Sequence, residues 1–227
     1  MLRFARQLQV LEAEARDALG SGASERTVTP VAVNADSLAT WFRPVLREVA
    51  GWTDTSLDLR VEDEGYSSQL LRQGDVLGAV TADPIPVNGC RAQRLGFMRY
   101  LPVATPELRA RFTHKNDVDW QHMPVLQFNA KDELQNHMLR AHGVSQPPPR
   151  HLIPSSEAFL EAVRAGLGWG MIPELQLDGD LSRGTLVLLE KDAHHDVALY
   201  WQTWTIRSER LTRITDAIRA ASEAALR

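Results

Sequence analysis

The chain has 227 residues, of which 44% are hydrophobic and 24% are charged. This composition is that of an ordinary globular protein and excludes a wholly disordered chain. The chain carries 25 Lys and Arg residues against 29 Asp and Glu residues, a formal net charge of −4. It therefore lacks the basic excess expected of a self-sufficient nucleic-acid binder.

Cysteine content and hydropathy favour an intracellular protein. The single cysteine, Cys90, excludes an internal disulfide and fits a reducing compartment. No apolar run approaches the roughly 18 residues of a membrane span. The N-terminus, with Arg3, Arg6 and Glu12, lacks the apolar core of a signal peptide. We therefore expect a soluble cytoplasmic protein with no membrane partner.

The first predicted element is an amphipathic helix over residues 1–20. Its apolar residues recur at three- and four-residue steps, namely Phe4, Leu8, Leu11, Ala15 and Ala18. Gly20 and Gly22 end the helix and form a joint, because glycine takes the left-handed cap conformation at low cost. A single helix of this length is marginal in water, so its stripe needs a partner. It is either a dimerisation or linker helix, or a terminal helix lying on its own domain.

The next five elements alternate between strand and helix. Strands are predicted at 27–35, 56–64 and 76–82, with helices at 37–51 and 67–73 between them. Such alternation favours a parallel sheet covered by helices, with ligand groups at the carboxyl ends of the strands. We expect Asp36 or Ser37 to cap the first of these helices.

The second half of the chain repeats the same alternation. After a connecting strand at 99–105, the predicted elements are strands at 124–130, 150–154, 170–174 and 197–206 and helices at 132–142, 157–166 and from 211 to 225. Asp132 and Gln135 have the spacing of a capping box. Two α/β lobes joined by two crossing strands are the economical arrangement, and a cleft between lobes is a usual ligand site.

Motifs typical of enzymes are weak in this chain. The glycine-rich stretch 166–170 follows a helix instead of preceding one, which predicts a helix cap and turn rather than a phosphate loop. The seven histidines, including His194 and His195, show no metal-ligand spacing. Cys90 lies in a predicted loop without a nucleophile signature. We expect no metal site, no cofactor and no catalytic residue.

Two helix openings are better candidates for ligand binding. The first, Asn34 to Ser37, ends a strand and begins a helix, so its backbone N–H groups suit a carboxylate or phosphate. The second, at Ser155 and Ser156, lies in the other predicted lobe. Simple helix capping explains either one alone, but two openings facing one cleft favour a shared ligand.

Acidic residues near the strand ends would suit a cationic ligand. Most such residues are solvated or cap helices, but a charge-assisted hydrogen bond shielded from water contributes about 1.5–3 kcal/mol. The candidates are Asp36, Glu62, Asp63, Glu64, Asp83, Asp132 and Glu157. The aromatic residues Tyr200, Trp201 and Trp204 favour core packing between the lobes over a ligand platform.

The order of these motifs resembles the LysR-type transcriptional regulators, in particular their lysine- and arginine-responsive LysG/ArgP branch. The resemblance covers nearly the whole chain. It rests on the linker-like residues 2–15 and on VAVNADSLATWF, LLRQGDVLGAVTADP, SSEAFLEAVRAGLGWGMIPEL and YWQTW. VNADSLATW and the block from SSEAF to MIPEL are specific to the branch, whereas the glycine turns are common to the superfamily.

The resemblance implies two Rossmann-like subdomains with the type 2 periplasmic-binding-protein-like fold. It assigns residues 1–22 to the linker helix and joint, 27–100 with 205–227 to the first subdomain, and 101–204 to the second. In the family a helix-turn-helix module of about 60 residues precedes the linker. Because this chain begins at the linker-like segment, we expect an effector-binding fragment that reaches DNA only through that absent module.

The resemblance also implies an effector, a basic amino acid such as lysine, arginine or histidine, and control of genes such as a basic amino-acid exporter. Family effector contacts fall on Asn34, Ala35, Asp36, Ser37, Thr81, Ala82, Phe128, Asn129, Asp132, Ser155 and Ser156. We expect the α-carboxylate at Ala35 to Ser37 and Thr81, and the distal cation at Asp36, Asp83, Asp132 or Glu157. The exposed stripe on the first helix predicts a dimer or tetramer. A stand-alone amino-acid-binding protein and a small-molecule enzyme on the same fold are the alternatives.

Overall fold

The computed structural model describes residues 26–61, 67–115, 117–206 and 208–227. The predicted helix over residues 1–20 and its joint lie outside these residues, as do Glu62, Asp63 and Glu64. Within the described ranges, no helix combines the length and the apolar character needed to cross a membrane.

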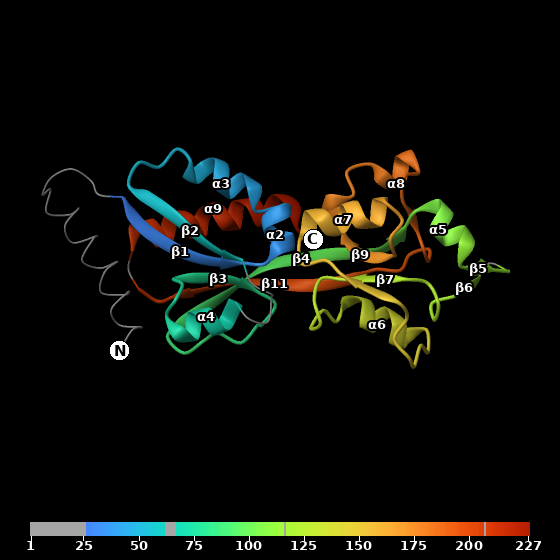
Figure 1. Cartoon of the computed structure of the whole chain (residues 1–227). Helices are drawn as coiled ribbons and strands as arrows, with labels where there is room; N and C mark the ends of the chain where they lie inside the picture. The colour runs from blue at the N-terminus through green and yellow to red at the C-terminus, as the bar shows by residue number, and fades with distance from the viewer. Residues whose placement is uncertain (1–25, 62–66, 116, 207) are drawn as a thin grey trace, which may run out of the picture. The chain divides into compact units, whose positions relative to one another are not determined.

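The chain folds as two compact α/β units, joined by two strands (Figure 1). Of the described residues, unit 1 contains those from 26 up to Phe97 together with Ala198–Arg227, and unit 2 those within Met98–Val197. The chain passes from one unit to the other in β4 (Cys90–Ala104) and returns in β11 (His195–Trp204). The predicted architecture of two α/β lobes with two crossing strands is confirmed.

The sheet of unit 1 has the predicted parallel centre. β1 (Thr27–Val33) lies between β2 (Thr55–Val61) and β3 (Gly78–Thr81) and runs parallel to both, while β11 is antiparallel to β3. The last three residues of β1 and all of β3 are buried. Burial on both faces explains why these strands read as apolar runs instead of alternating.

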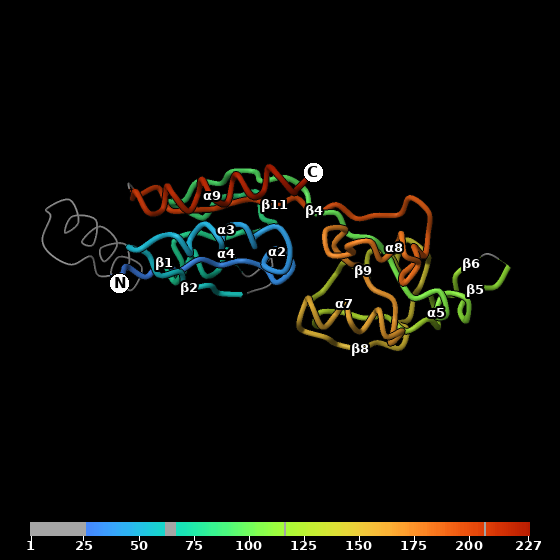
Figure 2. The backbone as a smooth tube through the Cα atoms, turned by 90° about the horizontal axis from the view of Figure 1, so that it is seen from above, coloured from blue at the N-terminus to red at the C-terminus, as the bar shows by residue number. Residues whose placement is uncertain are grey.

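Helices cover both faces of this sheet. α3 (Arg43–Val49) and α9 (Glu209–Ala225) pack together on one side, and α4 (Ser67–Gln73) lies on the other (Figures 1 and 2). The apolar stripe predicted for the last helix is its buried face, with Ile214 and Ile218 fully buried. Trp201 and Trp204 are core residues of unit 1, and the Trp201 indole N–H donates to Thr215 Oγ1 at 3.0 Å.

The single helix predicted over 37–51 is wrong, because the structure breaks it into α2 (Ala35–Ala39) and α3. Pro44 lies in the first turn of α3, where its missing N–H is tolerated, whereas inside a continuous helix it would remove a hydrogen bond and clash with the preceding turn. The Thr40 hydroxyl donates to the backbone oxygen of Asp36 at 2.6 Å beside the break. The predicted caps Asp36 and Ser37 lie inside α2, and Asn34 is the N-cap residue.

The strand expected at 99–105 is the second half of a much longer one. β4 has 15 residues and begins at Cys90, so the loop predicted around Cys90 is wrong. Its first half is largely exposed and rich in arginine and glutamine, a composition that resembles a loop. Pairing with β11 holds this polar segment extended.

Unit 2 combines antiparallel and parallel strands. The second half of β4 pairs with β9 (Gly170–Pro173) and β10 (Val187–Leu188), and β7 (Val125–Gln127) pairs in parallel with β8 (Arg150–Leu152). The remaining elements are α5 (Pro106–Arg111), β5 (Thr113–His114), β6 (Asp117–Val118), α6 (Leu134–Ala141), α7 (Ser156–Arg164), the 3-10 helix η1 (Glu174–Gln176) and α8 (Asp180–Arg183). Phe159 and Val163 of α7 pack with Leu126 and Ile172 in one core cluster.

Two local predictions in unit 2 have opposite outcomes. The capping box of Asp132 and Gln135 is wrong, since Glu133 is the N-cap of α6 and makes no side-chain cap bond. The predicted turn after α7 is confirmed. Gly166 adopts φ 73°, a left-handed conformation, and its N–H donates to the Val163 carbonyl at 3.0 Å.

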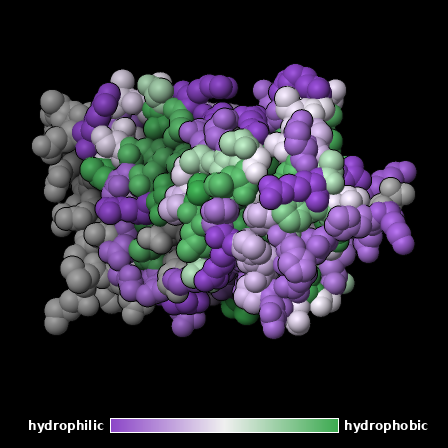
Figure 3. Space-filling model, turned by 45° about the vertical axis from the view of Figure 1, so that its right-hand side comes forward, coloured by the Kyte–Doolittle hydropathy of each residue, from purple (hydrophilic) through white to green (hydrophobic). Residues whose placement is uncertain are grey.

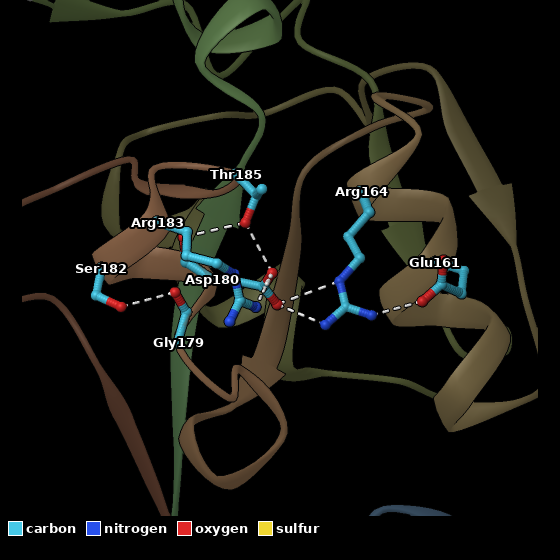
Figure 4. A network of polar contacts seen from close by, with 7 residues as sticks. All are labelled: Glu161, Arg164, Gly179, Asp180, Ser182, Arg183 and Thr185. Atoms are coloured by element: carbon cyan, nitrogen blue, oxygen red, sulfur yellow. Dashed lines mark hydrogen bonds and ion pairs between the residues drawn. The ribbon is translucent and has the colours of Figure 1, made fainter.

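A buried carboxylate joins α7 to α8 in unit 2 (Figure 4). Asp180 Oδ2 accepts from the Arg164 guanidinium at 2.6 Å, and Asp180 Oδ1 accepts from the Thr185 hydroxyl at 2.7 Å. Arg183 lies 3.3 Å from the same carboxylate, and Arg164 also contacts Glu161. The Asp180 side chain is only 3% exposed, so this network supplies the charge pairing that its burial requires.

Large apolar side chains also reach the surface, and on the face drawn in Figure 3 hydrophobic residues gather in one area with hydrophilic ones around it. In unit 1 the exposed large apolar side chains are Val28, Leu46, Val61 and Ile85, and in unit 2 Leu152, Leu167, Leu175 and Leu181.

Candidate functional site

The first set of predicted ligand residues gathers at the carboxyl edge of the unit 1 sheet. Val31 lies opposite Gly78 and Ala32 opposite Ala79 in the parallel pair. The same offset places Asn34, which follows β1, beside Thr81 at the end of β3. Asn34 is only 3% exposed and Thr81 is fully buried. The two strand ends that the sequence singled out are therefore neighbours.

The corner after β1 presents backbone more than side chain. Asn34 is the N-cap of α2 in extended conformation, and the first N–H groups of a helix have no acceptor within it. α2 has five residues, so the helix dipole adds little. The Ser37 hydroxyl is fully buried and accepts the Trp41 indole N–H at 2.9 Å. Ser37 thus anchors Trp41, a role that sequence reasoning did not foresee.

The loop after β3 is an ordered turn built on Asp83. The Asp83 N–H donates to Thr81 Oγ1 at 3.1 Å, and Asp83 Oδ1 accepts the Ile85 N–H at 2.9 Å. Arg72 Nη2 lies 3.8 Å from Asp83 Oδ2, and both side chains are substantially exposed. A contact of this kind contributes little energy in water, so the Asp83 carboxylate is accessible to a cationic ligand.

Sequence reasoning missed Gln202, which comes from β11. Its side chain is fully buried, and its amide nitrogen donates to the carbonyls of Asp83 and Ile85 at 2.8 and 2.9 Å. Its amide oxygen accepts the Val87 N–H at 3.0 Å. The available signal was an amide in the mostly apolar part of the strand after Asp196, because a buried amide needs partners.

The second set of predicted residues gathers at the carboxyl edge of the parallel pair in unit 2. Gln127 lies opposite Leu152, so Phe128 and Asn129 follow β7 beside the residues that follow β8. Asp132 closes the loop after β7, because its carboxylate accepts the N–H groups of Phe128 at 2.8 Å and of Leu134 at 3.1 Å. This carboxylate therefore has a structural task that its spacing alone did not show.

The start of α7 supplies the serines of the second set. Ser155 is the N-cap, and its side chain accepts from the backbone N–H of Ala158. Ser156 is buried and accepts from Gln176 Nε2 at 3.1 Å. Glu157 is exposed in the first turn.

The chemical groups of the candidate site can be stated for the described residues. Burial raises the pKa of the Cys90 thiol to about 11, so this cysteine is not a thiolate nucleophile near neutral pH. Among the described residues, no group of three or more His, Cys, Asp or Glu side chains could hold a metal ion. What the two edges offer are backbone N–H groups, hydroxyls and carboxylates, which suit a small zwitterion.

Two α/β units joined by two crossing strands, each with polar loops at the carboxyl ends of parallel strands, define a type 2 periplasmic-binding-protein-like domain of the effector-binding class. Residues 25–223 match the family model described as the LysR substrate binding domain. The chain belongs to the LysR family.

Relatives of the chain include the transcriptional regulators LysG and ArgP. The chain is 49% identical to the lysine export transcriptional regulatory protein LysG of Corynebacterium efficiens, over 100% of this chain and 78% of that protein. It is 36% identical to the regulator ArgP of Pseudomonas aeruginosa PAO1, over 97% of this chain and 75% of that protein. The resemblance to the LysG/ArgP branch is confirmed.

Solved structures give the same result for the fold. Full-length LysG from Corynebacterium glutamicum with bound effector arginine is 43% identical and superposes with a TM-score of 0.89, covering 99% of this chain and 77% of that one. ArgP from Mycobacterium tuberculosis gives a TM-score of 0.89 at 42% identity, covering 100% and 77%.

Proposed function

We propose that this chain is the effector-binding part of a LysR-type transcriptional regulator and that its effector is a basic amino acid, arginine or lysine. The observation that carries the proposal is the similarity, at 43% identity, to LysG with bound arginine. The polar edges of the two units supply the chemistry that such a ligand needs. The regulated genes would include a basic amino-acid exporter, as the name of the C. efficiens relative indicates.

The proposed contacts in unit 1 recognise the amino-acid end of the effector. The α-carboxylate accepts from backbone N–H groups of Ala35 to Ser37 and from the Thr81 hydroxyl. Asn34, beside Thr81 in register, completes this edge. Charge-assisted hydrogen bonds of this kind are worth about 1.5–3 kcal/mol each when shielded from water.

The proposed contacts in unit 2 are Phe128, Asn129, Asp132, Ser155, Ser156 and Glu157. Each oxygen of the Asp132 carboxylate accepts a backbone N–H, which fixes where its negative charge lies. The prediction that one ligand contacts both units, and that Ala82 contributes to its binding, is part of this proposal.

Binding regulates by shifting a conformational equilibrium. A ligand shifts a two-state equilibrium only by its differential affinity for the two states. A hundredfold preference corresponds to about 2.7 kcal/mol, which is enough for a switch. The coupling to DNA follows from the family to which the chain belongs.

Calorimetry with L-arginine, L-lysine and L-leucine tests the effector. We expect heat from arginine or lysine and none from leucine, because leucine carries no distal cation. Equal binding of leucine, or no heat from any of the three, would refute the proposal.

Replacing Thr81 with valine tests the site. Thr81→Val removes a buried hydroxyl and its bond to the Asp83 N–H, so we expect affinity for arginine to fall about tenfold, the loss of one hydrogen bond to a charged group. Thr113→Val is the matched control, since it removes an exposed hydroxyl that bonds the Arg109 carbonyl in unit 2. Equal affinities of the two variants would exclude Thr81 from the site.

An enzymatic role is the second candidate function. The named relatives are transcriptional regulators, which supports a sensor that returns its ligand unchanged. Chromatography of arginine or lysine after incubation with the protein distinguishes the two, because a sensor leaves the amino acid intact and an enzyme consumes it.

A further inference from the structure

The side-chain amide of Gln202, on β11, holds the loop that follows β3. One fully buried side chain makes three hydrogen bonds to the backbone of residues 83–87, and all three lie between 2.8 and 3.0 Å. Its partners are the carbonyls of Asp83 and Ile85 and the N–H of Val87. Every residue of this set belongs to unit 1.

The hydrogen-bonding pattern of the amide fixes the loop in one conformation. An amide supplies two N–H donors and an acceptor oxygen, and this loop presents two carbonyls and one N–H to match them. No apolar side chain of the same size reproduces this pattern, and a buried polar group left without a partner is costly. The conformation of residues 83–87 therefore depends on Gln202 as well as on the loop's own Pro84, Pro86 and Asp83.

The loop in turn directs the Asp83 carboxylate. The Asp83 N–H is held by Thr81 Oγ1 and its Oδ1 by the Ile85 N–H, so backbone and side chain are fixed together. Thr81 is the residue proposed to meet the effector's α-carboxylate. In any amino acid the α-ammonium is attached to the carbon next to that carboxylate, whereas the distal cation of arginine is several bonds away. Since the Asp83 N–H lies 3.1 Å from Thr81 Oγ1, the carboxylate of Asp83 is a nearer partner for that α-ammonium than for a cation several bonds away.

We propose that Gln202 is a positioning residue that sets selectivity for the α-amino group of the effector, by holding Asp83 where it accepts the α-ammonium. This inference rests on the proposed function and deepens it. The distal cation is left to the other proposed carboxylates, Asp36, Asp132 and Glu157.

Calorimetry with three ligands distinguishes the contributions of the α-amino group and the α-carboxylate to binding. The ligands are L-arginine, 5-guanidinopentanoic acid, which is arginine without the α-amino group, and agmatine, which is arginine without the carboxylate. We expect the wild-type protein to bind arginine at least about tenfold more tightly than 5-guanidinopentanoic acid, the worth of one charge-assisted hydrogen bond.

The variants are Gln202→Leu and Asp83→Asn. Each variant should lower the affinity for arginine about tenfold and change the affinity for 5-guanidinopentanoic acid by less than about twofold. The selectivity for arginine over 5-guanidinopentanoic acid is then lost. Agmatine retains the α-nitrogen, so the affinity for agmatine should fall together with that for arginine. The double variant should bind arginine no more weakly than Asp83→Asn alone, because both changes remove the same contact. Gln202→Met, an unbranched replacement that fills the same volume, serves if the leucine variant does not fold.

The control is Gln121→Leu, which removes a glutamine whose amide bonds the Gln146 carbonyl in unit 2. It should leave all three affinities unchanged. Equal weakening of arginine and 5-guanidinopentanoic acid in the Gln202 variants would give Gln202 a purely structural role and overturn the inference while leaving the proposed function intact. A wild-type protein that binds leucine as well as arginine, or binds neither, would overturn the proposed function itself.

Discussion

Removing the carboxylate of Asp180 should destabilise unit 2 far more than removing an exposed one. Asp180→Asn keeps the shape of the side chain but removes its charge and one acceptor. The carboxylate oxygens accept from the Arg164 guanidinium at 2.6 Å, Arg183 at 3.3 Å and the Thr185 hydroxyl at 2.7 Å, and in asparagine one of these two oxygens becomes an N–H donor. This site joins α7 to α8, so its loss weakens the packing of both helices.

The expected loss of stability follows from how deeply Asp180 and Arg164 are each buried. Removing one partner of a fully buried ion pair costs about 3–5 kcal/mol, because the other charge is left without compensation. The Arg164 side chain is 32% exposed and can recover water, which lowers the cost to about 2–3 kcal/mol. In a chain of this size, each kcal/mol lowers Tm by about 2–4 °C, so we expect a fall of about 4–12 °C.

Urea unfolding followed by circular dichroism measures this loss. Asp58→Asn is the control, since Asp58 pairs with Arg60 at 2.7 Å on the surface and such pairs contribute about 0–1 kcal/mol. If Asp180→Asn cost no more than Asp58→Asn at pH 7, the network would not have the energetic role derived from its burial.

The pH dependence gives an independent measurement of the same network. Burial alone would raise the pKa of Asp180, but hydrogen bonds from Arg164, Thr185 and Arg183 outweigh it and hold the pKa below its ordinary value of 3.8. A lowered folded-state pKa contributes stability above the unfolded-state value of about 3.9, and this contribution is lost as the pH falls through the folded-state pKa. The stability difference between wild type and Asp180→Asn should therefore shrink below about pH 4. A difference that stays constant down to pH 2 would contradict the assigned pKa direction.

Two further predictions concern packing and assembly. Gly78→Ala should destabilise unit 1 by about 1–3 kcal/mol in the same urea assay, because an added Cβ would lie 2.2 Å from the buried Trp201 ring. Gly51→Ala is the control and should be close to neutral, since the nearest atom to its added Cβ would be 3.4 Å away. Similar losses of stability in the two variants would contradict the packing argument. We also propose a dimer or larger assembly, in keeping with the exposed apolar side chains and the predicted N-terminal stripe, and light scattering that shows only a 25.4 kDa monomer at working concentration would count against it.

Periodicity predicted most elements and misplaced those that depend on distant partners. The helix at 209–225 follows from its own apolar spacing, because it buries one continuous stripe. The sequence predicts a loop around Cys90, where β4 in fact begins, since a polar strand is held by its neighbour and not by its own composition. The capping box at Asp132 failed for a similar reason, because the carboxylate bonds Phe128 across the loop.

The candidate site shows the same division. Strand alternation indicated that the ends of β1 and β3 share an edge, and the register of the parallel pair brings Asn34 beside Thr81. Gln202, 119 positions along the chain from Asp83, was not predicted as part of that edge. Its three bonds arise only because β11 returns antiparallel to β3.

The sequence by itself determined the family, the alternation of strands and helices, and the strand ends that carry polar groups. These features depend on local spacing and on recognisable motifs. Tertiary structure alone decided where α2 stops, which carboxylates serve the backbone and which side chain supports the loop after β3. The physical reason is that burial and hydrogen-bond partnership are properties of groups brought together across the fold. A one-dimensional pattern records the groups but not their partners.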